Sequence, residues 1–407
     1  MRIGITCYPT YGGSGVVAAE LGVALARRGH EIHFISYALP FRLQQYDQHV
    51  FFHEVEVLTY PLFDHPPYTI ALAAKMADVA RQVGLDLLHV HYAIPHAVSA
   101  QLATEVLGPG GPAVVTTLHG TDITLVGRDP SLFSITRFAI ERSDGVTCVS
   151  RYLAERTREL FGIARPLTVI PNFVDTHRFA RREDTSLRAV FAPRGERVLI
   201  HLSNFRPLKR IPDVIRVFAA VRRSLPARLL LVGDGVEAPA AASLARDLGV
   251  ADDVLFLSRQ EDIPRLLLAG DLFLLPSEEE SFGLAALEAQ SCGLPVIATR
   301  VGGLPEVIAD GETGHLFPVG SVEAMAEAAL HLLQDTERHR EMAEAARRRV
   351  LAHFDAGLIV PRYEAFYTAV LAERRATAGG RPPPRSQRPG SPGLAGGAAP
   401  LPPRPDP

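Results

Sequence analysis

The sequence is poor in three features that would point to particular protein classes: cysteine, net charge and long apolar runs. Only three cysteines, Cys7, Cys148 and Cys292, occur in 407 residues, and none forms a CxxC pair. This pattern argues against a disulfide framework or a zinc site and favours a reduced, cytoplasmic protein. The formal net charge of -3 indicates no nucleic-acid partner. No uncharged apolar run reaches the roughly 20 residues that span a membrane, so we expect no stable membrane insertion.

Short apolar runs alternate with helical patterns along most of the chain, which is typical of parallel sheets wound with helices. The first series of strands is predicted at residues 2–8, 31–36, 55–60, 85–91, 113–118, 145–149 and 167–170, with helices such as 14–28 and 94–107 between them. The second series is predicted at residues 197–202, 229–232, 254–257, 272–275, 295–298 and 315–317. We therefore expect an α/β protein with two Rossmann-like sheets.

The length of the chain favours two domains over one core. We expect an N-terminal domain at residues 1–175, a polar, irregular linker at 176–195 and a C-terminal domain at 196–355. A helix at 356–375 is expected to pack back on the N-terminal domain. From residue 379 onward the chain holds ten of its 32 prolines and no apolar period, so residues 376–407 are predicted to be a disordered tail.

The most informative segment is SEEESFGLAALE at residues 277–288, which places Glu280 and Glu288 eight residues apart around a predicted helix start at or beside Ser281. It follows an apolar strand, and ligands of α/β sheets sit beyond the carboxyl ends of strands. Unpaired amides at a helix start bind anions; here they belong to Gly283, Leu284 and Ala285. Two carboxylates flanking a phosphate site fit a sugar nucleotide. Taken alone, the spacing also fits a solvated acidic loop before an ordinary helix.

A second loop supplies positive charge. Arg206 and Lys209 follow the predicted strand at 197–202 and are three residues apart at a loop-to-helix transition. Two cations there can converge on a diphosphate, the guanidinium as a fork and the ammonium as a point charge. They would stabilise the charge that grows on a departing nucleoside diphosphate. The alternative is ordinary surface charge.

The glycine-rich loop Gly12-Gly13-Ser14-Gly15 follows the first strand and opens a helix. It resembles half of a dinucleotide-binding fingerprint, but the full spacing is missing and no acidic residue follows at the expected strand end. A dinucleotide-dependent oxidoreductase is therefore the rival from another enzyme class. The loop still lets the backbone approach a phosphate or carboxylate closely, although a simple tight turn explains it as well.

Histidines gather after two further strands. The segment HGTD at residues 119–122 follows one strand, and a second group lies at the end of the strand before it: His89, His91, Tyr92 and His96. A lone histidine is usually structural, but their position at strand ends favours a ligand-facing role. Metal ligation is disfavoured because the spacings match no metal-binding array.

Taken together, these motifs resemble the retaining glycosyltransferases of the GT-B fold, glycosyltransferase family 4, over residues 1–373. Segments 12–17, 91–97, 116–124 and 203–210 are similar to family members that act in bacillithiol biosynthesis. The resemblance implies two Rossmann-like domains facing across a cleft. It also implies transfer of N-acetylglucosamine from UDP-N-acetylglucosamine, bound by the second domain, to the hydroxyl of L-malate, bound by the first. No metal or other cofactor is implied.

The resemblance also implies roles for individual residues. In the donor site these are Gly13, Gly15, Asn204, Arg206, Lys209, Glu280, Phe282, Gly283, Leu284 and Glu288. Within that set Glu288 binds the ribose, Arg206 and Lys209 bind the diphosphate, and Glu280 binds the sugar. The catalytic set is His119, Arg206, Lys209 and Glu280. The acceptor-side candidates are Ser14, Tyr92, Thr117 and Asn172, with Arg128 and Arg137 as candidate partners of the acceptor carboxylates.

Several alternatives stay open at this stage. Other family 4 enzymes use inositol phosphate or a lipid or polysaccharide sugar as acceptor. Residues 61–69 contain no Lys or Arg to bind an acceptor phosphate, which favours a carboxylate acceptor. A sugar-nucleotide-binding regulator without catalysis would use the same fold, and a homo-oligomer is compatible with the sequence.

Overall fold

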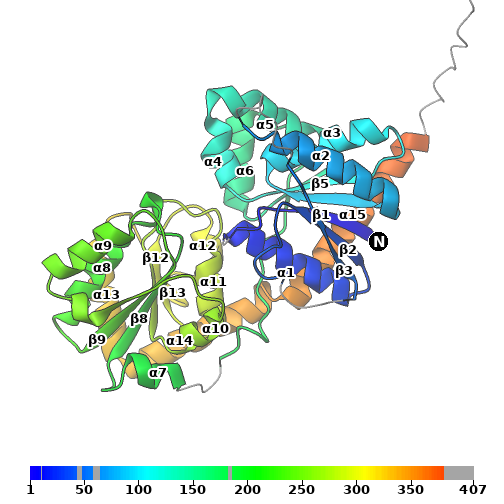
Figure 1. Ribbon diagram of the computed structural model, residues 1–407. Helices are drawn as coiled ribbons and strands as arrows, with labels where there is room; N and C mark the ends of the chain where they lie inside the picture. The colour runs from blue at the N-terminus through cyan, green and yellow to red at the C-terminus, as the bar shows by residue number, and fades with distance from the viewer. Residues whose placement is uncertain (11, 44–47, 58–64, 182–185, 380–407) are drawn as a thin grey trace, which may run out of the picture.

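The computed structural model describes the chain except residues 11, 44–47, 58–64, 182–185 and 380–407. Figure 1 shows two bodies, each built on one sheet with helices on both faces, and a last helix that runs from the second body back to the first. Most of the predicted tail at 376–407 lies outside the described residues, although the last helix includes the backbone to Gly379.

The first sheet has seven parallel strands in the order β3-β2-β1-β4-β5-β6-β7. The strands are β1 (Arg2–Thr6), β2 (Glu31–Ser36), β3 (Val50–Glu54), β4 (Leu87–His91), β5 (Ala113–Leu118), β6 (Gly145–Cys148) and β7 (Thr168–Val169). The helices of this half are α1 (Gly13–Arg27), α2 (Tyr68–Val79), α3 (Val98–Leu107), α4 (Thr121–Thr124), α5 (Pro130–Arg142) and α6 (Arg151–Phe161). Strand residues alternate between two cores: Ile3 and Ile5 pack with α1, whereas Leu88 and Val90 pack with α2 and α3.

The second sheet has six parallel strands in the order β10-β9-β8-β11-β12-β13. The strands are β8 (Arg197–Leu202), β9 (Ala227–Val232), β10 (Val254–Leu257), β11 (Leu272–Leu275), β12 (Val296–Thr299) and β13 (Gly314–Phe317). The helices of this half are α7 (Ser186–Phe191), α8 (Ile211–Arg222), α9 (Ala238–Asp247), α10 (Ile263–Leu268), α11 (Leu284–Ser291), α12 (Leu304–Val307), α13 (Val322–Gln334) and α14 (Thr336–His353). The chain then continues into α15 (Ala356–Gly379). The prediction of an α/β protein with two parallel, Rossmann-like sheets is confirmed.

Three local predictions differ from the structure. The third strand is β3 at Val50–Glu54. Residues 55–57 of the strand predicted at 55–60 are not part of a strand, although the Val55 amide donates to the Ser36 carbonyl at 2.9 Å, and 58–60 lie outside the described residues. The polar segment 176–195 contains α7, so it is not wholly irregular. The helix predicted at 94–107 begins as a wide turn over Ala93–Ala97 with Ile94 in an extended conformation, and regular α3 starts at Val98.

Both sheets reverse their strand order at a central point, between β1 and β4 in the first sheet and between β8 and β11 in the second. Loops that leave neighbouring strands in opposite directions part at such a point, and a crevice opens at the carboxyl ends of the strands. The segments after β1, β4, β8 and β11 are therefore the parts of the chain that the topology makes available to a ligand.

The last helix, α15, belongs to the core of the first body although it follows the second in sequence. It crosses back in Figure 1, where it is coloured orange. Its Tyr363 and Tyr367 are fully buried in the core that contains Ile3 and Ile5. The Tyr367 hydroxyl is hydrogen-bonded to His89 Nδ1 at 2.8 Å, so α15 also completes a polar network at β4.

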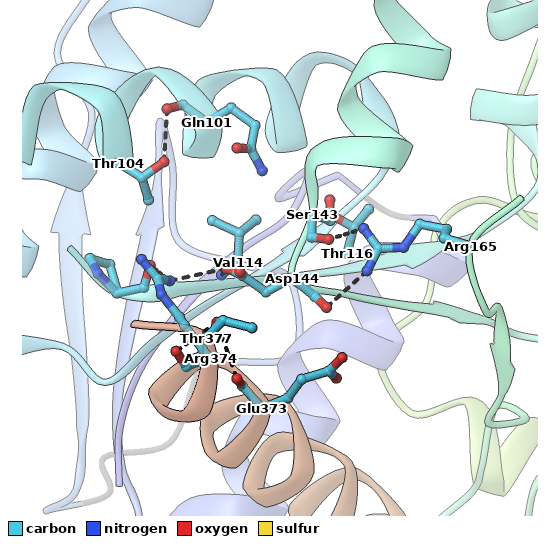
Figure 2. Close-up of polar contacts among 11 residues, drawn as sticks. Gln101, Thr104, Val114, Thr116, Ser143, Asp144, Arg165, Glu373, Arg374 and Thr377 are labelled. Carbon is cyan, nitrogen blue, oxygen red and sulfur yellow. Dashed lines mark hydrogen bonds and ion pairs between the residues drawn. The ribbon is translucent and has the colours of Figure 1, made fainter. Parts of the chain in front are cut away.

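The far end of α15 is tied to the amino end of β5, as Figure 2 shows. Asp144 accepts a hydrogen bond from the Val114 amide at 2.7 Å and pairs with the Arg374 guanidinium at 3.0 Å. Arg374 also donates to the carbonyl of Pro112. Next to Asp144, Arg165 donates hydrogen bonds to main-chain carbonyls at the end of α5. These carbonyls are among the acceptors that the end of a helix leaves unpaired. These contacts hold the chain's last described helix against the first sheet.

The burial of α15 predicts that its tyrosines stabilise the N-terminal half. Tyr367→Ala should lower the free energy of unfolding by about 3–5 kcal/mol, because it leaves a cavity and an unpaired His89 nitrogen. Chemical denaturation monitored by circular dichroism measures this. Thr368→Ala, at the exposed neighbouring position, should change it by less than about 0.5 kcal/mol. Equal effects of both changes would show that α15 is not part of the core.

Candidate active site

A cavity of about 700 Å³ lies between the two halves and is lined by residues of both. Its walls come from the segments after β1, β4 and β5 on one side and after β8 and β11 on the other. The structure brings most of the predicted site residues together there: Gly13, Ser14, Tyr92, His119, Asn172, Asn204, Arg206, Lys209, Glu280, Phe282, Gly283, Leu284 and Glu288.

Two predicted residues, Gly15 and Thr117, are not on the cavity wall. A Cβ atom at Gly15 would lie 2.4 Å from the carbonyl oxygen of Tyr8, so glycine there allows α1 to pack against the end of β1. Thr117 is fully buried in β5, where its hydroxyl is 2.7 Å from His89 Nε2 and 2.7 Å from Thr147 Oγ1. The structure gives both residues a role in packing, and neither reaches the space where a ligand would lie.

The candidate partners of the acceptor carboxylates, Arg128 and Arg137, are also not brought into the cavity. Both are exposed, in the turn before α5 and on α5 itself, and neither lines the cavity. The cations that do line the cavity are Arg42, Arg206 and Lys209.

Helix α11 begins later than the sequence predicts. Gly283 has a left-handed conformation with φ of 97° and precedes the first helical residue, Leu284, and no side chain caps this end. Glycine adopts that φ without the strain that a side chain would cause, so it allows the chain to turn into the helix here. The amides of the first turn therefore remain available at the cavity wall, and Glu288 lies about one turn into the helix rather than two.

Lys209 and Glu280 form an ion pair in the cavity wall. The Lys209 ammonium lies 2.5 Å from Glu280 Oε1, and Ser277 donates to the same oxygen at 2.9 Å. Both side chains are mostly buried. Arg206, in contrast, has no ion-pair partner among the described residues and is exposed at the cavity. Arg206 is thus the cation whose charge is available to an anionic ligand.

Helix α11 carries an ion pair that sequence reasoning missed. Arg42, from the loop after β2, lies 2.9 Å from Glu288 Oε1 and 2.5 Å from Glu20 Oε1 on α1. It therefore connects the N-terminal half to the second-half carboxylate that was predicted to bind ribose. Nothing in the local sequence marks Arg42, because its partners are distant in the chain.

Burial sets the protonation of this pair. Burial raises the pKa of the Glu288 carboxyl, and the charge of Arg42 opposes that rise. An uncompensated carboxylate in such a position would be costly, so Arg42 is the group that allows Glu288 to stay ionised.

The imidazole side of the cavity is neutral. Burial, with a smaller contribution from His96, lowers the pKa of His119 to about 3. Tyr92, next to it, has a φ of 93°, a strained conformation for a side-chain-bearing residue, and accepts a hydrogen bond from the Ser14 hydroxyl at 3.2 Å. Such strain is often found where a side chain must face a ligand. His119 is therefore a neutral hydrogen-bonding group.

Asp122 organises the loops around His119. Its carboxylate accepts hydrogen bonds from the amides of Ala93 at 3.0 Å and Gly120 at 2.9 Å, which joins the segments after β4 and β5. Burial raises its pKa to about 6, and these amide donors oppose the rise. Asn172, also at the cavity wall, is buried, and its side-chain oxygen has no hydrogen-bond partner among the described residues. A buried amide oxygen of this kind at a cavity wall is available to a ligand.

Within the described part of the chain, no helix is long and apolar enough to cross a membrane. The same residues contain no group of three or more His, Cys, Asp and Glu side chains arranged to hold a metal ion.

The Arg42–Glu288 pair makes a pH-dependent prediction. Arg42→Met leaves a buried carboxylate without its cation, which should cost about 3–5 kcal/mol of unfolding free energy at pH 7. Because the pKa of Glu288 is raised in the folded state, this group's contribution to stability falls as pH rises above its unfolded pKa. In Arg42→Met the folded-state pKa of Glu288 is higher still, so the loss of stability continues to higher pH.

Urea denaturation at pH 5 and pH 7 tests this: the deficit of Arg42→Met should be larger at pH 7. Arg178→Met is the matched control, since Arg178 pairs with Glu20 at 3.0 Å and its charge lowers the pKa of Glu288 less than that of Arg42 does. A deficit that is independent of pH would contradict the assignment of the charge to Glu288.

Comparison with known proteins agrees with this geometry. Residues 11–178 match the family model described as Glycosyltransferase Family 4, and residues 183–349 match the one described as Glycosyl transferases group 1. The chain is 50% identical over 374 residues to N-acetyl-alpha-D-glucosaminyl L-malate synthase of Bacillus anthracis, which covers 92% of this chain and 98% of that protein.

Solved structures agree at the level of the fold. Sucrose-phosphate synthase from Thermosynechococcus elongatus has a TM-score of 0.77 at 22% identity and covers 92% of this chain and 100% of that one. Anabaena HepE, solved in complex with UDP, has a TM-score of 0.74 at 22% identity and covers 90% of this chain and 99% of that one. Two facing parallel sheets, a cavity at their strand ends and a half-identical relative spanning both halves give one conclusion: the chain belongs to glycosyltransferase family 4.

Proposed function

We propose that this chain transfers N-acetylglucosamine from UDP-N-acetylglucosamine to the hydroxyl of L-malate, with retention of the anomeric configuration, as the first step of bacillithiol biosynthesis. The observation that carries the proposal is the 50% identity to the Bacillus anthracis enzyme, which spans both halves and therefore both substrate sides of the cavity. The geometry of the cavity is compatible with the same donor.

The donor lies along α11 in this proposal. Its diphosphate sits at the uncapped amide end of the helix, near Leu284, where the helix dipole and the free guanidinium of Arg206 both favour negative charge. Glu288 accepts hydrogen bonds from the ribose hydroxyls. Because Arg42 already holds Glu288 Oε1, the ribose uses the other oxygen or exchanges with Arg42.

The sugar lies at the other end of the same wall. Glu280, held by Lys209 and Ser277, is oriented to accept from sugar hydroxyls, together with the backbone of Phe282 and Gly283. In this arrangement Lys209 serves both Glu280 and the phosphates. His119 binds the sugar from the opposite wall.

Malate occupies the first half, beside Ser14, Tyr92 and Asn172.

The transfer step breaks the bond between the sugar's anomeric carbon and the phosphate oxygen. It forms a bond from that carbon to the malate hydroxyl oxygen, while the hydroxyl proton passes to the leaving phosphate. Charge on that phosphate is stabilised by Arg206, Lys209 and helix amides, the role a metal plays in other transferases. The proposed reaction therefore needs no divalent metal.

The proposal predicts that purified protein releases UDP from UDP-N-acetylglucosamine when L-malate is added, and equally in the presence of EDTA. A coupled UDP assay with an acceptor panel measures this. Faster turnover with inositol phosphate would change the acceptor assignment, and loss of activity in EDTA would refute metal independence. Donor binding without UDP release for any acceptor would indicate a sugar-nucleotide sensor.

Arg206→Ala should weaken UDP binding by about 10- to 100-fold, the loss expected when one hydrogen-bonded charge on a phosphate is removed. Its unfolding free energy should change by less than about 0.5 kcal/mol, because Arg206 has no ion-pair partner among the described residues. Calorimetric titration with UDP gives the affinity. Arg223→Ala, an exposed arginine at the far end of α8, is the control and should bind UDP normally. Normal UDP affinity in Arg206→Ala would remove Arg206 from the donor site.

A further inference from the structure

His91, the last residue of β4, contacts the cavity only through another histidine. Its ring is fully buried and does not line the cavity, but its Nδ1 lies 2.8 Å from Nε2 of His119, which does. The two rings stack with centroids 5.0 Å apart and an angle of 27° between their planes. His91 also anchors the segment beyond β4, since its carbonyl is 2.5 Å from His96 Nδ1.

The other nitrogen of His91 has no partner. Nε2 is buried and makes no hydrogen bond to any described residue. Burial lowers the pKa of both His91 and His119, so both rings are neutral at physiological pH and each carries one proton. The bond between them uses one of these protons, and the position of the other depends on which ring donates.

Two arrangements are compatible with the geometry. If His119 donates through Nε2, the proton of His91 must be on Nε2, which leaves a buried N–H without an acceptor. If His91 donates through Nδ1, its Nε2 carries only an unpaired lone pair, and His119 carries its proton on Nδ1. Buried donors are left unpaired more rarely than buried acceptors, so the second arrangement is favoured.

The second arrangement determines what His119 presents to a ligand. With Nε2 engaged by His91, Nδ1 is the ring nitrogen that stays available at the cavity, because it has no hydrogen-bond partner among the described residues. An Nδ1–H can only donate, so it selects an oxygen acceptor. The opposite tautomer could only accept from a hydroxyl. The tautomer of His119 therefore determines whether its ligand partner is an acceptor oxygen or a hydroxyl donor.

We propose that His91 is a positioning residue that holds His119 in the Nδ1–H tautomer, so that His119 donates a hydrogen bond to an oxygen of the transferred sugar. That the accepting oxygen belongs to the sugar rests on the proposed function, whereas the tautomer of His119 is a property of the protein without ligand. The two parts therefore fail separately.

The tautomer can be measured directly. Nitrogen-15 NMR of histidine-labelled protein without ligand should give His119 a protonated Nδ1 and an unprotonated Nε2. In His91→Asn the side-chain amide places an N–H near the position of the imidazole Nδ1, so the tautomer should persist. In His91→Phe no donor remains, and His119 should change to the Nε2–H form or a mixture.

Catalysis should follow the tautomer. His91→Phe should lower kcat about 10- to 100-fold, the usual cost of losing a group that orients a functional histidine, with KM for the sugar nucleotide changed less than about threefold. His91→Asn should recover most of the rate. A merely structural role would predict instead that kcat follows thermal stability in both variants, whatever the tautomer of His119.

His89→Phe is the matched control, because His89 is a fully buried histidine two residues earlier on the same strand and bonds Thr117 and Tyr367 rather than His119. Because the His89 ring packs on His91 with centroids 4.4 Å apart, the shifts can move slightly, but His119 should keep its protonated Nδ1 and unprotonated Nε2. A protonated Nε2 on His119 in the unmodified protein would overturn the proposal even if the variants fail to fold. An unchanged tautomer in His91→Phe would overturn it as well. If the tautomer is as expected but no acceptor yields UDP, the proposed function fails and the assignment of His91 stands.

Discussion

The constraint on which the rest of the structure depends is that two parallel sheets direct the carboxyl ends of their central strands at one cavity. In a parallel sheet every loop at that edge follows a strand, so short segments distant in sequence meet there. The segments after β1, β4 and β5 supply hydroxyl and imidazole groups and the Asp122 carboxylate, those after β2 and β7 supply Arg42 and Asn172, and those after β8 and β11 supply the remaining charged groups. Helix α15 supports this arrangement because it packs on the first sheet from the end of the chain.

The electrostatics of the cavity are nearly balanced before any ligand binds. Lys209 is paired with Glu280 and Arg42 with Glu288, whereas Arg206 has no paired carboxylate among the described residues. Pairing keeps buried carboxylates ionised and oriented, at the cost of engaging the cations. Among the described residues of the cavity, Arg206 and the start of α11 are the positive groups without a paired carboxylate, and the carboxylates of Glu279 and Asp122 also line the cavity.

The charged side of the site could be predicted from local sequence because its residues lie within short segments at strand ends. Glu280, Glu288, Arg206 and Lys209 all line the cavity as expected. Thr117 does not line the cavity, because its hydroxyl contacts His89 on β4 and Thr147 on β6, and the sequence of one strand does not show which neighbours its side chains meet. The partners of Arg42 could not be predicted, because Glu20 and Glu288 approach it only when the two halves meet.

By itself, the sequence determined the class of the fold, the succession of strands and helices along the chain, and the kinds of side chain at the strand ends. It could do so because apolar periodicity and glycine-rich turns are local properties. Tertiary structure alone decided which charges neutralise one another, which side chains face the cavity and which nitrogen of His119 is available. Those outcomes depend on distances and burial between residues far apart in the chain, such as His91 with His119 and Arg42 with Glu288. Such contacts form only when the sheets, the returning helix and the two halves pack together.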